Sequence, residues 1–232
     1  MSMRQITAVS QQGRRTTRID KVLAAGLERG FRGGATISTP YECEGELEET
    51  KDKYRDIVNV TRYVDLLRNG GPLTPNVYAF RLSELADRTD DANRNVIVKM
   101  GGIQLFVALV RDGTGLEKES AARALWKIAG NNSSIRTLVG DLGGIPPLVT
   151  LLGEGNNKQK ENAARALQNI AHNNDSNKMA ITAVGGIPLL VALVRNGTGG
   201  GSQAAKNLLV NLAAGNNVNS AAIRDAGGGQ YW

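Results

Sequence analysis

The sequence predicts an all-α protein built from stacked helical repeats, and three observations lead to this prediction. Pairs of glycines fall at 101–102, 143–144, 185–186 and 227–228, so the pair returns three times at a spacing of 42 residues. The first three pairs each precede an isoleucine and an apolar run, as in "GGIPPLVTLL" and "GGIPLLVALV". Aromatic residues make up only 4% of the 232 residues. Abundant Ala, Leu and Val then favour packed helices over a β-sandwich.

Each repeat contains three predicted helices. A short segment such as "DSNKMAITAV" follows an Asn, which is a good N-cap. The glycine pair ends this helix and permits positive φ, so the chain can bend sharply. Pro146 or Pro188 then suits the first turn of the middle helix, where its missing N–H costs nothing. After a polar turn comes a long helix, "ENAARALQNIA", in which Ala163, Leu167 and Ile170 share one face.

Three clear repeats and one fainter repeat divide the chain. The clear repeats are 101–142, 143–184 and 185–226, and residues 227–232 form a truncated stub. Residues 52–100 form a degenerate repeat, because "NVTRYVDLLRNGG" matches "GGIQLFVALVRDG" at a shift of 43 with Val58 and Asn59 in place of the glycine pair. No repeat follows Leu208, Leu209 and Leu212. The chain is therefore interpreted as truncated, as a fragment of a longer array, or as covered by a partner at this end.

Residues 1–51 are predicted to be a basic arm and a linker. Residues 1–40 hold seven Arg or Lys and two acids, a charge of +5, out of +6 for the chain. Residues 17–29 could form one amphipathic helix. A disordered or capping arm, an organelle-targeting sequence and an autoinhibitory segment are all compatible with this composition. Otherwise a cytoplasmic or nuclear protein is expected, since Cys43 is the only cysteine. No apolar run is long enough to predict a membrane span.

The three-helix unit of 42 residues, with Gly-Gly-Ile-Pro before its second helix and "AARALQNIA" in its third, resembles the armadillo repeat. It looks similar to the vacuolar-protein-8-like arrays of plants, fungi and oomycetes. The resemblance covers roughly residues 52–228. It implies an α-α superhelix, a right-handed solenoid in which the third helices line a concave groove. In this family, the groove binds partner proteins or extended peptides.

The resemblance also implies which residues face the groove. Importin-α-like members carry Trp and Asn four residues apart on the third helix. The Trp positions here are Phe80, Arg123, Arg165 and Asn207, and the Asn positions are Glu84, Lys127, Asn169 and Asn211. Asn therefore stands at two of its four positions and Trp at none, which argues against recognition of nuclear localisation signals. Arg123, Lys127 and Arg165 would favour an acidic partner.

A non-enzymatic scaffold that binds a protein or peptide is therefore the predicted function. The alternatives are a transport adaptor of the importin-α-like type and the substrate-recognition part of a ubiquitin-ligase system. No catalytic set, metal site, cofactor, small-molecule substrate or specific nucleic-acid partner is expected. His172 is predicted to cap a helix end or to be exposed. The Gly-rich stretch 196–202 is predicted to be an inter-helix turn, and Trp126 to be partly buried.

Overall fold

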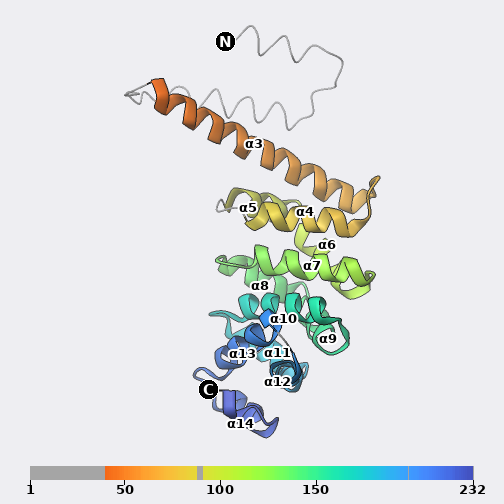
Figure 1. The fold of residues 1–232 in the computed structure, drawn as a ribbon, viewed down its shortest axis with the longest axis vertical. Helices are drawn as coiled ribbons and strands as arrows, with labels where there is room; N and C mark the ends of the chain where they lie inside the picture. Colours follow the sequence, from red (N-terminus) through yellow and green to blue (C-terminus); the bar gives the residue numbers. More distant parts are fainter. Residues whose placement is uncertain (1–39, 88–90, 198, 232) are drawn as a thin grey trace. The chain divides into compact units, whose positions relative to one another are not determined.

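The computed structural model describes residues 40–87, 91–197 and 199–231, with side chains from residue 51 to residue 230. All regular elements in these ranges are helices (Figure 1). Contacts group residues 51–232 into one compact unit, and the packing below is that of this unit. The α-helices are α3 Pro40–Asn69, α4 Pro75–Asp87, α5 Asp91–Lys99, α6 Gly102–Asp112, α7 Gly115–Ile128, α8 Ser133–Asp141, α9 Ile145–Glu154, α10 Asn157–Ala171, α11 Asp175–Ala183, α12 Gly186–Asn196, α13 Gly199–Ala213 and α14 Asn217–Asp225, and a 3-10 turn η1 follows at Gly229–Tyr231.

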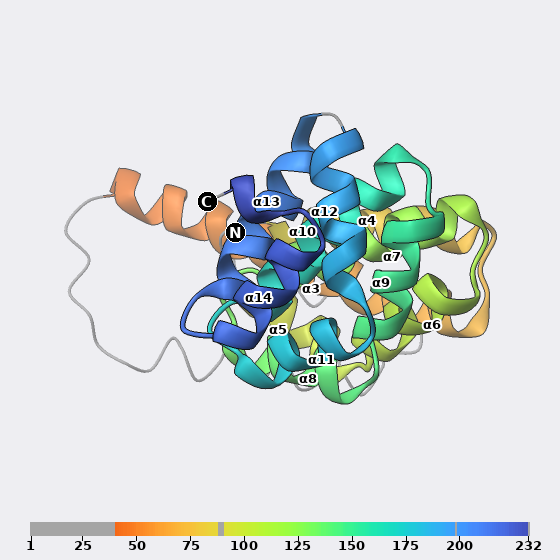
Figure 2. The same cartoon turned by 90° about the horizontal axis from the view of Figure 1, so that it is seen from below.

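The helices repeat in the predicted order of middle, long and short. The middle helices are α6, α9 and α12; the long helices are α4, α7, α10 and α13; the short helices are α5, α8, α11 and α14. Successive long helices follow one another down Figure 1, each packed on the next. Figure 2, turned by 90°, shows the short helices α8 and α11 lying together at one side of the stack. The predicted all-α repeat architecture is confirmed.

Apolar faces of neighbouring repeats share one continuous core. The predicted stripe of Ala163, Leu167 and Ile170 is fully buried on α10. Leu208 and Leu212 of α13 are also fully buried, although no complete repeat follows them in the sequence. A solenoid repeat buries its apolar face against its neighbours, and this is the packing seen here.

The glycine pairs at 101–102, 143–144 and 185–186 each make the bend between a short and a middle helix, and the pair at 227–228 follows the short helix α14. The first glycine of each pair has a positive φ, between 71° and 80°. The N–H of this first glycine bonds a carbonyl in the last turn of the short helix, as Gly143 does to Gly140. In two pairs the second glycine does the same, since Gly144 bonds the Val139 carbonyl and Gly228 that of Ile223. Pro146 lies in the first turn of α9 and Pro188 in that of α12, as predicted. The resulting angles are 80° between α8 and α9 and 83° between α11 and α12.

The short helices are capped as the sequence predicts. Asn132, Asn174 and Asn216 are the N-caps of α8, α11 and α14, and each side chain accepts a hydrogen bond from the backbone N–H three residues later. The long helices α7 and α10 begin with capping boxes at Thr114 and Asn156. These bonds give acceptors to backbone N–H groups in the first turn of each helix, which have no acceptor within the helix itself.

Helix α3 differs from the predicted organisation in two ways. It begins at Pro40, within the stretch expected to be a linker, and it runs without a bend through Val58 and Asn59. The acidic segment from Pro40 is rich in Glu, a good helix former, and Pro suits a first helical position. At 58–59 the glycine pair is missing, so no positive φ interrupts the helix. The predicted helix at 17–29 lies outside the described residues, as do the side-chain surroundings of Cys43.

Taken as pairs, α8 with α9 and α11 with α12 have the length and apolar composition of a membrane segment, but they are bent by 80° and 83°. In the described part of the chain, no single helix is long and apolar enough to cross a membrane.

Candidate functional site

The eight residues predicted to face a partner lie on the four long helices. We call the surface that they share the long-helix face. Its members are Phe80 and Glu84 on α4, Arg123 and Lys127 on α7, Arg165 and Asn169 on α10, and Asn207 and Asn211 on α13. None of the eight is fully buried. Because two residues four apart share one helix face, the stack repeats the pair from helix to helix.

Between α4 and α7, the predicted residues bind one another. Arg123 forms an ion pair with Glu84, donates a hydrogen bond to the Ser83 hydroxyl and stacks on the Phe80 ring at 4.8 Å from its centre. Lys127 forms an ion pair with Asp87, at 2.6 Å between Nζ and Oδ2. Four of the eight predicted residues therefore contact each other or a carboxylate of the adjacent repeat.

Between α7 and α10, the bonds run from side chains to backbone carbonyls. The Asn169 amide donates to the Trp126 carbonyl at 2.9 Å, and the Asn162 amide donates to that of Glu119 at 3.2 Å. Arg165 pairs with Glu161 on its own helix and lies 4.6 Å from the centre of the Trp126 ring. Lys127 lies 4.4 Å from the same ring centre. Trp126 is partly buried, as predicted, and these two cations lie against it.

On α13, the predicted residues Asn207 and Asn211 make no polar contact with α10 in the described part of the chain. Asn207 accepts a hydrogen bond from Gln203 of the same helix at 2.9 Å. Within the described residues, the Asn211 side chain has no hydrogen-bond partner. The nearby Val210 is 46% exposed. This end of the long-helix face therefore presents amide groups that the fold leaves unused.

The charge of the long-helix face differs from the sequence-based interpretation. Arg123, Lys127 and Arg165 each have a carboxylate partner, so the three cations do not make the face electropositive. The partners Glu84 and Asp87 have side chains about half exposed (48% and 52%), more exposed than those of Arg123 and Lys127 (33% and 18%). Sequence reasoning missed Asp87 and Glu161. Only the spacing of about 40 residues between Asp87 and Lys127 hinted at a contact between adjacent repeats.

His172 and the Gly-rich stretch 196–202 both lie at helix ends. His172 is exposed at the C-cap of α10, as predicted, and its carbonyl accepts a hydrogen bond from Arg136. In the Gly-rich stretch, Asn196 ends α12 and Gly197 caps it, whereas Gly199–Ser202, predicted as part of a turn, form the first turn of α13. Within the part of the chain that the structure describes, no three His, Cys, Asp or Glu side chains gather as metal ligands would.

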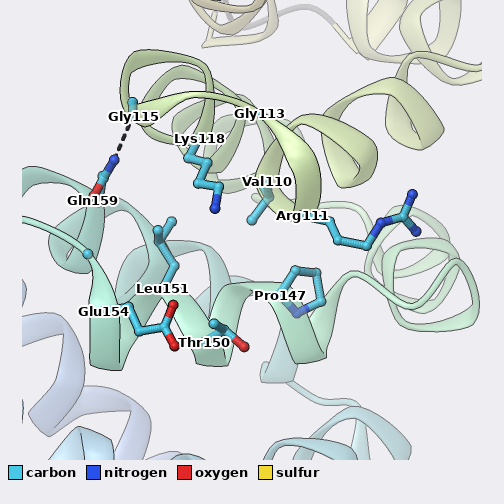
Figure 3. A pocket seen from close by; sticks show the side chains of 11 residues that line it. Val110, Arg111, Gly113, Gly115, Lys118, Pro147, Thr150, Leu151, Glu154 and Gln159 are labelled. Atoms are coloured by element: carbon cyan, nitrogen blue, oxygen red, sulfur yellow. Dashed lines mark hydrogen bonds between the residues drawn. The ribbon is translucent and has the colours of Figure 1, made fainter.

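A pocket of about 330 Å³ lies at the turns between the middle and long helices of two adjacent repeats (Figure 3). Val110, Pro147 and Leu151 give it apolar walls, and Gln159 crosses one end by donating to the Gly115 carbonyl at 2.6 Å. Lys118 and Glu154 bring opposite charges to it. Beside the pocket, a hydrogen bond from Arg111 lowers the pKa of Asp112. None of the eight predicted residues lines this pocket.

Comparison with known proteins identifies the repeat. A family model, the armadillo/beta-catenin-like repeat, matches residues 131–172. An engineered protein of known structure is 32% identical, with a TM-score of 0.68 over 74% of this chain and 69% of that protein. A designed armadillo repeat protein gives a TM-score of 0.65 at 22% identity, over 73% of this chain and 70% of its own. The chain belongs to the armadillo repeat family.

A natural armadillo protein shares the fold at lower identity. The armadillo-repeats-only protein from Plasmodium falciparum matches with a TM-score of 0.63 and 16% identity. The match covers 82% of the present chain and 88% of the Plasmodium chain. A comparison with curated proteins finds no match. The resemblance to the vacuolar-protein-8-like type stays a prediction.

Proposed function

We propose that this armadillo protein is a non-enzymatic scaffold and that its long-helix face binds an extended segment of a partner protein. The observation that carries the proposal is the row of exposed and half-buried side chains contributed by four successive long helices. Asn169 and Asn211 supply amide oxygens and N–H groups that could pair with both edges of an extended backbone. A designed armadillo repeat protein with the same fold has been solved in complex with the peptide (KR)4, which supports this mode of binding.

The charge of the partner cannot be inferred from the three cations of the long-helix face alone. An acidic segment would be favoured by Arg123, Lys127 and Arg165, but it would have to compete with carboxylates that already hold these cations. We therefore propose that backbone hydrogen bonding and apolar contacts select the partner, with little help from net charge. Binding should then weaken only slightly between low and physiological salt.

A second candidate function is that of a transport adaptor. The half-exposed carboxylates of Glu84 and Asp87 favour it, because they could receive the basic side chains of a cargo. The Trp positions hold Phe80, Arg123, Arg165 and Asn207, so the ring slots that the resemblance implies would be absent. A role beside a ubiquitin ligase, a cytoplasmic or nuclear location and organelle targeting remain predictions.

Site-specific photocrosslinking tests the proposed face. A photoreactive amino acid would replace Val210 on α13, which is 46% exposed, or Val218 on α14, which is 75% exposed. Val218 is a matched control, because a chance encounter would mark the more exposed valine more strongly. In lysate of the source cells, we expect one set of proteins to crosslink from position 210 and not from 218. Equal labelling from both positions would contradict the proposal.

A further inference from the structure

The pocket between the turns of two adjacent repeats exists because one repeat lacks a leucine that its neighbours have. Pro147 of α9 lines the pocket, and the corresponding residues one repeat before and one repeat after it are Leu105 and Leu189. Both leucines are partly buried and pack against the core. A Cβ on Gly153 would lie 3.5 Å from Leu189 Cδ2, and Gly153 corresponds to Arg111, which lines the pocket. Leu189 therefore covers, in the next repeat, the place that Pro147 leaves open.

The walls of the pocket are aliphatic where they are most buried. Val110 and Leu151 are 2% and 5% exposed, and Pro147 lies beside them (Figure 3). The volume of about 330 Å³ is at the small end of the range for ligand sites, roughly 300–1,000 Å³. The size and the walls suit one aliphatic side chain together with the backbone on either side of it.

Two side chains of opposite charge line the pocket without pairing with each other. Lys118 reaches it from α7, and Glu154 lies on α9 across from it (Figure 3). Neither side chain forms an ion pair or a hydrogen bond within the residues that the structure describes. The nearby Asp112 carboxylate, which the charge of Lys118 also attracts, is held by Arg111 at 2.8 Å between Nη2 and Oδ2. The pocket therefore offers one cation and one anion to a partner.

We infer that this pocket is a second docking site, which receives one leucine-sized aliphatic side chain of a partner protein. The partner supplies from outside the side chain that Leu105 and Leu189 supply within their own repeats. An acidic residue on one side of it pairs with Lys118, and a basic residue on the other side pairs with Glu154. None of the eight residues of the long-helix face lines the pocket, so this site goes beyond the function proposed above.

The test selects peptides on the full chain from a randomised displayed library and removes those that also bind the Pro147→Leu variant. Leucine at position 147 closes the pocket in the way that Leu189 does in the next repeat, whereas the long-helix face is unchanged. Peptides held by the long-helix face therefore bind both chains and are discarded. We expect the remaining peptides to carry a Leu or Ile between an acidic and a basic residue. Burial of that side chain is worth about tenfold or more in affinity.

Affinity and melting temperature are then measured for three variants. Pro147→Leu should keep or raise the melting temperature, because filling a cavity stabilises a fold. Pro146→Leu is the matched control, since this adjacent proline is exposed and does not line the pocket, and it should leave affinity within about twofold. The charge exchange Lys118→Glu/Glu154→Lys should weaken a remaining peptide about tenfold, and it should bind instead the peptide whose acidic and basic residues have changed places.

Four results would overturn the inference. They are that no peptide remains after the removal step, that the remaining peptides bind Pro146→Leu as weakly as Pro147→Leu, that the charge exchange leaves their affinity unchanged, and that Pro147→Leu melts below the wild-type chain. None of these results touches the proposed function, because crosslinking from position 210 tests the long-helix face separately.

Discussion

The two glycines of each pair meet different requirements. Gly143 has φ of +71°, and a Cβ placed on it would have open space around it. Gly144 has an ordinary φ of −73°, but a Cβ there would lie 2.7 Å from Val139 Cγ1 and 2.9 Å from the Val139 carbonyl oxygen. The first glycine is needed for its backbone conformation and the second for close contact between helices.

Alanine at the two positions should therefore destabilise the fold for separate reasons. Gly143→Ala should cost about 1–2 kcal/mol of unfolding free energy through left-handed strain. Gly144→Ala should cost about 1–3 kcal/mol, because a backbone carbonyl must move. Gly143→Asn is the control, since Asn tolerates the left-handed conformation. Urea unfolding of the three variants is the measurement. Equal losses for Gly143→Ala and Gly143→Asn would show that φ is not the constraint.

Arg136 is a buried cation that has no carboxylate partner among the residues that the structure describes. It is 7% exposed and donates hydrogen bonds to the carbonyls of Ala129 and Gly130 at the end of α7 and of His172 at the end of α10. Burial lowers the pKa of its guanidinium. The carbonyl ends of helices attract positive charge, so this side chain closes two long helices at once.

Removing this cation should be among the most damaging single changes. Arg136→Met keeps much of the apolar stem but leaves three carbonyls without their donor, so we expect a loss of about 2–4 kcal/mol in urea unfolding. Arg224→Met on α14 is the control, because Arg224 is exposed, and it should lose less than about 0.5 kcal/mol. Similar losses for both would mean that the three hydrogen bonds contribute little.

At the scale of elements, short helices are joined by an amide that fits against a glycine. Asn177 of α11 is 4% exposed and donates to the carbonyls of Arg136 on α8 and Ile170 on α10. Its Oδ1 occupies the space over Gly140 of α8, where an added Cβ would lie 2.1 Å from it. Gly140 and Asn177 therefore form one contact between α8 and α11.

This contact predicts a change of sign in a double-mutant cycle. Gly140→Ala alone should destabilise by about 1–3 kcal/mol, because the Cβ displaces the Asn177 amide. The three atoms nearest to that Cβ all belong to Asn177. In an Asn177→Ala background, the same change should stabilise by up to about 1 kcal/mol through helix propensity. Urea unfolding of the four chains gives the coupling energy, and additive effects would contradict the contact.

At the scale of the whole molecule, the features that could be predicted from the sequence are those that depend on a few neighbouring residues. Glycine pairs, prolines and Asn caps act within a few residues, so helix order and bends could be read from them. The helical start at Pro40 and the absence of a bend at Val58–Asn59 were missed. At 58–59 the missing glycines already signalled a continuous helix.

Contacts between repeats were harder to predict than the repeats themselves. The ion pair of Arg123 with Glu84 joins residues 39 apart, and that of Lys127 with Asp87 joins residues 40 apart. The exact register of neighbouring helices decides such pairs, and a 42-residue period does not specify it. For this reason the sequence predicted which helices carry the eight side chains but not the ion pairs that balance their charge.

The same contacts should set the order in which the stack opens. Three amide bonds and a cation over a ring join α10 to α7, whereas no hydrogen bond or ion pair joins α13 to α10 in the described residues. With about 1 kcal/mol for each bond, α13 and α14 should open at a free energy about 3 kcal/mol below that of α7 and α10.

Native-state hydrogen exchange measures these opening free energies directly. We expect amides of α13 and α14 to exchange as one group, before those of α7, α8 and α10. Asn162→Ala/Asn169→Ala should move α10 toward the weaker group, because it removes two of the bonds to α7. In that variant α10 still lies between α7 and α13. A lower opening free energy for α10 would therefore result from the lost hydrogen bonds and not from its position in the stack. Exchange of all four long helices as one group would show that apolar packing alone holds the repeats together.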